Sequence, residues 1–179
     1  MSELVNLIWL LLVVFVFHDL EEIITVEGWL AQKREQVLRA LPSWLQKFVE
    51  PSLAMNTAQF AVAVTCVFAV LAAAVVLAAA TLPLGTYLPF FLVCLHVMFL
   101  HVFTHIGHTI ALRTYTPGVV TAVVLVLPYS VYTYVRLFEA GVLTWPLVWS
   151  TLPFCLLAVP ILYAAHWLGQ AAGGLVSRG

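Results

Sequence analysis

The sequence contains very little charge. Of its 179 residues only 8% are Asp, Glu, Lys or Arg, whereas 64% are hydrophobic. A soluble domain of this size needs far more polar surface, so water is excluded as its main solvent. The formal net charge is −1 and basic residues form no cluster. Because phosphate backbones are bound by such clusters, a nucleic-acid partner is excluded as well.

Cysteine pairs and a signal peptide are also lacking. The cysteines stand alone within apolar stretches and form no CxxC pair, so we expect packing residues rather than disulfides or metal ligands: Cys66, Cys94 and Cys155. No Lys or Arg precedes the first apolar stretch, and acidic residues stand where a small-residue cleavage site would be. We therefore expect this stretch to be retained as a helix.

Long apolar stretches are abundant. A spanning helix needs about 20 mainly apolar residues, and five stretches meet this requirement: Leu4–Ile24, Leu53–Leu82, Leu88–Leu112, Val119–Phe138 and Trp145–Leu168. Pro128, Pro153 and Pro160 lie within the last two, where each removes a backbone hydrogen bond and predicts a kink. We predict an all-α fold: one integral membrane bundle of about five transmembrane helices, a single domain over residues 1–179.

The segment between the first two stretches has a different pattern. From Val26 to Pro51, apolar residues recur mostly at spacings of three, four and seven, with Lys and Arg between them. This is typical of an amphipathic helix in the membrane interface, with its tryptophans at headgroup level. An alternative is a lid over a site beneath it.

Basic residues are distributed unevenly over the ends of the predicted spans. Six of the seven fall on one side, counting the tail: Lys33, Arg34, Arg39, Lys47, Arg113 and Arg178. Only Arg136 falls toward the other side. The positive-inside rule therefore predicts the N-terminus outside and the C-terminus inside.

Acidic residues and histidines interrupt the apolar pattern in two places. At about 100° per residue, His18, Glu21 and Glu22 share an arc of roughly 100°, and Asp19 points away from Glu22's side of it. In the third stretch, a second group shares one face at the spacing i, i+4, i+7: His101, His105 and His108. His96 lies roughly 140° away from His101, so we interpret it as a core histidine.

The predicted topology places both groups at one depth. The first and third helices both run inward and carry their polar residues near the cytoplasmic end. The second helix begins there with Asn56, and the fifth brings His166 to the same side, where we interpret it equally as an interfacial belt residue. A single site on the cytoplasmic side is expected.

A divalent metal would explain why these groups are buried. Each acidic residue near a helix centre costs about 2.5–3.5 kcal/mol unless it is neutralised. Carboxylates and imidazoles suit Zn, Fe, Mn or Ni, and Zn is favoured. The candidate ligands suffice for one or two ions: His18, Glu21, Glu22, His101, His105 and His108. Two simpler readings remain open, namely carboxylates snorkelling toward Lys33 and Arg34, and histidines that hydrogen-bond between helices.

Four blocks of sequence, in this order, resemble the HXXEE family of small bacterial and archaeal membrane proteins, whose biochemical role is unassigned: His18-Asp-Leu-Glu-Glu22, Asn56-Thr-Ala-Gln-Phe60, His101-Val-Phe-Thr-His105 with Gly107-His108, and Arg113-Thr-Tyr-Thr-Pro-Gly118. The resemblance covers Leu4 to Tyr129 and implies a bacterial or archaeal plasma membrane. It adds Asn56, Tyr115, Pro117 and Gly118 to the motif residues. His108 stands where glutamine is expected in many relatives, which favours four or five protein ligands.

Residues beside the expected metal have two readings each. Pro117 and Gly118 predict a turn that brings Arg113 and Tyr115 to the cytoplasmic mouth. These two are either interfacial anchors or groups that bind a phosphate or carboxylate headgroup. Asn56 either starts a helix or orients a ligand or substrate.

The leading hypothesis is a metal-dependent membrane enzyme that hydrolyses a lipid or other apolar substrate arriving from the bilayer. His18, Glu21, His101 and His105 would hold metal, Glu22 would act as general base, and Asn56 and Tyr115 would assist catalysis. Arg113 and Tyr115 would bind substrate. Alternatives are a di-iron or di-manganese oxidoreductase, a divalent-metal transporter and a metal-binding protein without catalysis. Gly169 to Gly173 match GxxxG, which leaves a homo-oligomer open.

Overall fold

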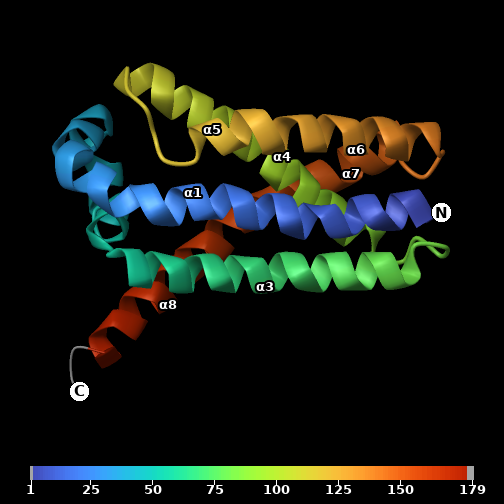
Figure 1. Ribbon diagram of the computed structural model, residues 1–179, viewed down its shortest axis with the longest axis horizontal. Helices are drawn as coiled ribbons and strands as arrows, with labels where there is room; N and C mark the ends of the chain where they lie inside the picture. Colours follow the sequence, from blue (N-terminus) through green and yellow to red (C-terminus); the bar gives the residue numbers. More distant parts are fainter. Residues whose placement is uncertain (1, 177–179) are drawn as a thin grey trace.

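The computed structural model describes residues 2–176, and in this part of the chain every regular element is helical (Figure 1). Arg178, used above for topology, lies outside it. The α-helices, the 3₁₀-helices η1 and η3 and the π-helix η2 are α1 (Ser2–Ala40), α2 (Ser43–Val49), η1 (Ser52–Ala54), α3 (Thr57–Thr81), α4 (Leu88–Leu112), α5 (Val119–Thr121), η2 (Ala122–Val126), α6 (Leu127–Glu139), α7 (Trp145–Thr151), η3 (Leu152–Leu157) and α8 (Ala158–Val176).

Four helical runs are long and apolar enough to cross a membrane: Thr57–Thr81, Leu88–Leu112, Val119–Glu139 and Trp145–Ala172. The third comprises α5, η2 and α6, and the fourth comprises α7, η3 and most of α8. The first part of α1 runs beside them (Figure 1). This is the architecture of a helical membrane protein, as predicted, and a fifth crossing by α1 stays a prediction.

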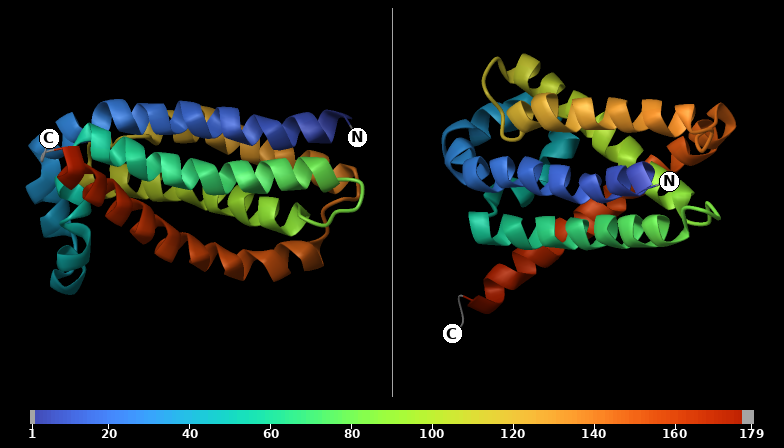
Figure 2. Two further views of the ribbon diagram at one scale, coloured as in Figure 1. Left: turned by 90° about the horizontal axis from the view of Figure 1, so that it is seen from below. Right: turned by 45° about the vertical axis from the view of Figure 1, so that its right-hand side comes forward.

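The predicted separate amphipathic helix after the first span is wrong in its boundaries, because α1 continues through this segment to Ala40. The weakest helix former on the way is Gly28, and one glycine costs a helix about 1 kcal/mol. Good helix formers such as Gln, Lys, Arg and Leu follow until Pro42. At one end of the bundle the last part of α1 turns away from the long axis, together with α2 (Figure 2).

The core forms where α1, α3 and α4 pack together. Ile8 and Leu11 of α1 and Phe91 of α4 are fully buried there. Small residues of α3, Ala74 and Ala78, are also buried and let the neighbouring helix approach closely. The core therefore holds the first half of α1 in a fixed position relative to α4.

Prolines mark the two places where the long runs depart from α-helical geometry. Pro128 cannot donate a hydrogen bond to the carbonyl of Val124, and the π-helix η2 occupies this turn. Pro153 lies at the start of a 3₁₀ segment, η3. The run from α7 to α8 is bent, with α7 and η3 beside α4 and with α8 beside α3 (Figure 2). The predicted irregularity is therefore seen at Pro128 and Pro153, whereas Pro160 lies within the α-helix α8.

The helices alternate in direction, and one end of the bundle collects the polar residues. This end holds the last turns of α4, the first turns of α3 and α5, and the later turns of α8, beside the middle of α1 (Figure 1). Gly169 of α8 packs here against the Gln59 carbonyl of α3, where a Cβ would have no room. The predicted common depth of the polar groups is therefore confirmed, whereas their side of the membrane stays a prediction.

Candidate metal centre

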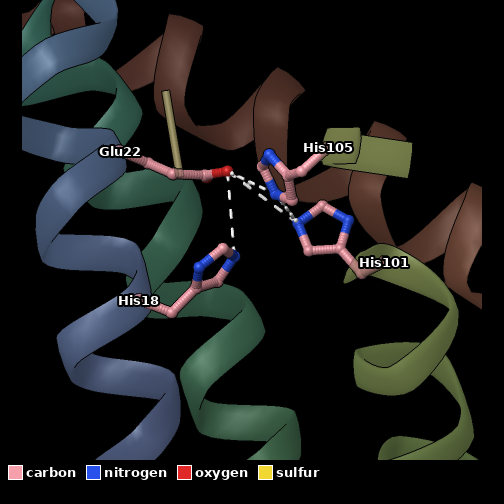
Figure 3. Close-up of side chains that lie close together, drawn as sticks. All are labelled: His18, Glu22, His101 and His105. Carbon is pink, nitrogen blue, oxygen red and sulfur yellow. Dashed lines mark hydrogen bonds and ion pairs between the residues drawn. The ribbon is translucent and has the colours of Figure 1, made fainter. Parts of the chain in front are cut away.

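Four side chains from α1 and α4 place one ligand atom each within 4.8 Å of one another: His18, Glu22, His101 and His105 (Figure 3). Glu22 Oε1 lies 3.1 Å from His105 Nε2, 3.8 Å from His101 Nε2 and 3.9 Å from His18 Nε2. The His101 and His105 Nε2 atoms are 2.8 Å apart. We call these four residues the His–Glu cluster.

The cluster uses the spacing i, i+4 on both helices. His18 and Glu22 stand one turn apart on α1, as His101 and His105 do on α4, so each pair points in one direction. His18 and His105 are buried, and Glu22 and His101 are partly exposed. The cluster is thus closed on one side and open on the other.

Hydrogen bonding selects the tautomer of His18. Thr121 Oγ1 lies 2.5 Å from Glu21 Oε2, and because a carboxylate only accepts, the single hydroxyl hydrogen is donated to Glu21. The His18 Nδ1 atom, 3.0 Å from the same oxygen, must then carry its own hydrogen and donate it. The Nε2 atom of His18 consequently keeps its lone pair, and this lone pair faces the cluster.

The same reasoning applies to His101. Thr104 Oγ1 donates to the His101 carbonyl at 2.7 Å and can therefore only accept from His101 Nδ1, 3.2 Å away. Two of the three histidines thus aim an Nε2 lone pair at the carboxylate of Glu22.

This arrangement fits a metal ion. His18 Nε2 is a buried atom that makes no hydrogen bond with any residue in the described part of the chain, which would be costly if it stayed unpaired. Its nearest polar neighbours are acceptors or other imidazoles, and lone pairs converging with a carboxylate are a donor set typical of zinc and similar divalent ions.

Glu21 is held outside the cluster, although the sequence predicted it as a ligand. Its Oε1 accepts from the Tyr115 hydroxyl at 2.7 Å and from the Val120 amide at 3.3 Å. Its Oε2 accepts from the amide of Thr121 at 2.7 Å and from its hydroxyl. Both oxygens are already used, and the start of a helical run is a favourable place for a carboxylate. Glu21 therefore orients Thr121, which orients His18.

The sequence model of a family described as "Protein of unknown function with HXXEE motif" matches residues 9–133. That range contains the whole His–Glu cluster and the turn beside it. The chain belongs to the HXXEE family. The predicted resemblance is confirmed, and the motif is His18 to Glu22. No curated protein and no solved structure matches the chain.

The two glutamates of the HXXEE motif have different environments. The second, Glu22, contacts all three histidines of the cluster, whereas the first, Glu21, binds Tyr115 and the start of α5. Burial raises the pKa of the Tyr115 phenol, so this group stays a donor to Glu21 at neutral pH. Tyr115 thus touches the motif from outside the cluster.

Gly118 closes the cluster from the α4–α5 turn. Its φ is +83°, in the left-handed region, as the predicted turn at Pro117 and Gly118 requires. A Cβ at this position would lie 2.7 Å from Glu22 Oε1 and 2.7 Å from His105 Cε1. Only glycine therefore lets the turn approach Glu22 this closely.

The other predicted residues lie around the cluster rather than in it. His108 is exposed and lines a cavity beside it. Asn56 caps α3 in a capping box with Gln59, which agrees with its interpretation as a helix-start residue. Arg113 ends α4 in a left-handed conformation and is exposed. His96 bonds Tyr134 and Thr151 inside the bundle and is a core histidine.

Sequence reasoning missed two residues near the motif. Thr121 gave no signal because it lies 103 residues from His18 in an apolar stretch. Asp19 was expected to point away, yet only 8% of it is exposed and it lines the same cavity as His18 and Glu22. Its position in an apolar helix was the only available signal for burial.

Two cavities meet at the cluster. The first, about 490 Å³, lies between α1, α3, α4 and the run from α7 to α8. The second, about 590 Å³, lies under the last part of α1, α2 and the end of α4. Both are bounded by the same four residues: Glu22, Phe60, His101 and His166. A molecule in either cavity would reach the open side of the cluster.

Proposed function

We propose that this protein is a metal-dependent integral membrane hydrolase, with one divalent ion held by His18, Glu22, His101 and His105. The observation that carries the proposal is the buried Nε2 lone pair of His18, which makes no hydrogen bond within the described residues and points at three other potential ligands. Zinc is the favoured ion because the donor set is three imidazoles and one carboxylate without thiolate.

The chain's own residues supply the remaining functions of such a site. When bound, a zinc ion would polarise a substrate carbonyl and lower the pKa of a coordinated water to about 7. Glu22 makes its histidine contacts through Oε1, which leaves Oε2 to accept a proton from water at the open side. Thr121 and Thr104 fix the tautomers of His18 and His101.

A lipid or another apolar molecule is the substrate class that the surroundings support. Two observations support this class: the cluster lies beside four helical runs apolar enough to span a membrane, and the first cavity has a mainly apolar lining that ends at the cluster. The basic residues of the α1–α2 connection favour the cytoplasmic side for this end of the bundle.

A divalent-metal transporter is the second candidate, because two cavities meet at the cluster and could form a path through it. The first cavity argues against this use. Away from the cluster its lining offers a cation only the Thr151 hydroxyl and the sulfurs of Cys94 and Met98, too few groups to replace a hydration shell along the cavity.

Elemental analysis of the purified protein tests the metal site. Wild type should carry about one divalent ion per chain, and His18→Ala and His105→Ala should lose it. His108→Ala is the matched control: it removes a histidine of the same helix that lies outside the cluster, and it should retain the ion. Metal-free wild type, or full occupancy in both cluster variants, would contradict the site.

Function is then tested with the metal-loaded protein. Cleavage of long-chain esters in detergent that is absent from the metal-free protein and restored when the ion is added back supports the hydrolase. Metal uptake by sealed vesicles without ester cleavage would instead support the transporter.

A further inference from the structure

The first cavity separates its polar from its apolar residues. The polar lining gathers at one end, near the cluster: His18, Asp19, Glu22, His101 and His166. The remaining lining residues are apolar, with Thr151 as the one exception within this cavity. A ligand that fills the cavity would need a polar group at one end and hydrocarbon along the rest.

The first cavity is long and narrow, as its lining on α4 and on α3 indicates. On α4 its lining runs from Pro89 to His101, and on α3 it runs from Leu71 to Phe60. At a rise of 1.5 Å per residue the two walls are about 18 Å and about 17 Å long. The two independent walls agree, and this length with a volume of about 490 Å³ suits one extended hydrocarbon chain better than two side by side.

The cavity also reaches the lipid-facing surface. Phe154 and Leu157 of η3 line it and are 56% and 54% exposed. They belong to η3, the 3₁₀ segment that contains Pro153 and packs beside α4. A chain could therefore enter sideways from the bilayer without crossing water.

The second cavity provides a different environment for the other half of a ligand. Its lining mixes apolar residues of α1 and α2 with polar ones near the cluster, including Thr104, His108 and Thr116. Because Glu22 and His101 border both cavities, a ligand that extends through the junction would present its linkage at the open side of the cluster.

We propose that the first cavity binds the single hydrocarbon chain of an amphiphile, whose ester or amide linkage lies at Glu22 and His101 and whose head lies in the second cavity. The binding part stands on the cavities alone, and the reaction rests on the proposed function. Hydrolysis of such an ester breaks the acyl carbon–oxygen bond. The water oxygen joins the acyl carbon, and one water proton ends on the departing alcohol.

Binding can be measured with monoacylglycerols carrying octanoyl, dodecanoyl or hexadecanoyl chains, as competitors of a fluorescent fatty-acyl probe on the full chain in detergent. Wild type should prefer the longer chains, and a diacylglycerol should compete poorly. Equal competition by all chain lengths, or strong competition by the diacylglycerol, would overturn the single-chain cavity.

Two substitutions on α4 then test how far along the cavity a bound acyl chain extends. Val93 and Val97 line the cavity, about 12 Å and 6 Å along the helix from His101. Val93→Phe should weaken hexadecanoyl binding about tenfold by overpacking and leave octanoyl binding within about twofold. Val97→Phe should weaken both. Val76→Phe is the control, because Val76 is 47% exposed and does not line this cavity. Identical effects of Val93→Phe and Val97→Phe on both chains would overturn the proposal.

The proposed reaction and the proposed chain-binding cavity can be rejected independently of each other. Suppose that binding depends on acyl-chain length as expected in wild type and in His105→Ala, but metal-loaded wild type cleaves no ester. The proposal for the cavity then stands and the proposed hydrolase function fails. Cleavage without any chain-length dependence would retain the hydrolase and reject the cavity.

Discussion

The hydroxyl hydrogen of Thr121 determines which nitrogen of His18 faces the cluster. Thr121 can donate only once, and Glu21 receives that hydrogen, so His18 has to donate its Nδ1 hydrogen and present Nε2. Within the described chain, Thr121 makes no hydrogen bond with Glu22 or with the histidines of α4. It is therefore a positioning residue that acts through His18.

Replacing Thr121 should change metal affinity more than stability. Thr121→Val removes the acceptor for His18 Nδ1, and we expect metal affinity to fall about 10–100-fold, as for other groups that orient a ligand. Thr121→Ser keeps the hydroxyl and should restore most of it. Competition with a zinc chelator measures the affinity. Equal affinity of the valine and serine variants would contradict this role.

Gly118 should tolerate no side chain. Gly118→Ala adds a Cβ at 2.7 Å from Glu22 Oε1 and forces alanine into a left-handed conformation, so we expect destabilisation by about 1–3 kcal/mol. Gly107→Ala is the control, since nothing lies within 4 Å of its Cβ position on α4 and alanine favours a helix. Thermal unfolding in detergent measures both. A Gly118→Ala midpoint as high as that of Gly107→Ala would refute the close approach.

The residues of the cluster were predictable only in part. The spacing of His101 and His105 on one helix face, and the placement of His18 and two glutamates in one arc, follow from helix geometry alone. Which glutamate contacts the histidines does not, because it depends on the start of α5, 100 residues further along the chain. The sequence likewise contains no local signal for Thr121.

At the scale of elements, α1 combines a core segment and an arm beyond Glu22 that lies against the α4–α5 turn. The Trp29 indole donates to the Tyr115 carbonyl at 2.6 Å, and the Gln36 amide donates to the Leu112 carbonyl at 2.9 Å. The sequence predicted the amphipathic character of this arm. Its continuity with α1 was missed, because the apolar stretch ends at Ile24 although no residue that follows, Gly28 included, is strong enough to end the helix before Ala40.

The arm is also fixed to the start of α3, and this contact should depend on pH. Glu27 accepts from the Thr57 amide at 2.6 Å and from the Thr57 hydroxyl, and these bonds lower the pKa of Glu27 below its usual 4.5. A lowered pKa means that the contact stabilises the fold above about pH 4.5 and that this contribution is lost as the pH falls through the lowered pKa.

Glu27→Gln should reveal this dependence. We expect wild type to unfold at a higher temperature than the variant at pH 7, and the difference to shrink steadily as the pH is lowered below about 4.5. Thermal unfolding at a series of pH values measures it. A difference that is constant over the whole series would show that the charge of Glu27 makes no contribution.

At the scale of the whole molecule, the alternation of helix direction brings distant residues to one end. The sequence predicted this correctly for α1, α3, α4 and α8, because membrane spans of similar length have to alternate. The cavities were not predictable in this way. They depend on how the run from α7 to α8 is bent, which hydropathy alone does not determine.

The orientation in the membrane is the remaining prediction at this scale. Ser43→Cys, at the first residue of α2, should react with a membrane-impermeant maleimide only after the cytoplasmic side is opened. Thr144→Cys, before α7 at the other end, should react in intact cells. Wild type is the blank, since its three cysteines lie within the helical bundle. The opposite labelling pattern would invert the topology.

The length of α1 has one further consequence. Its 39 residues extend for about 58 Å, roughly twice the hydrocarbon thickness of about 30 Å, so a large part of the helix has to lie outside the membrane interior. His18 and Glu22 belong to the same uninterrupted helix as the arm at the surface. A force applied to the arm, by crowded headgroups or by a change in bilayer thickness, would therefore act on two of the four residues of the His–Glu cluster.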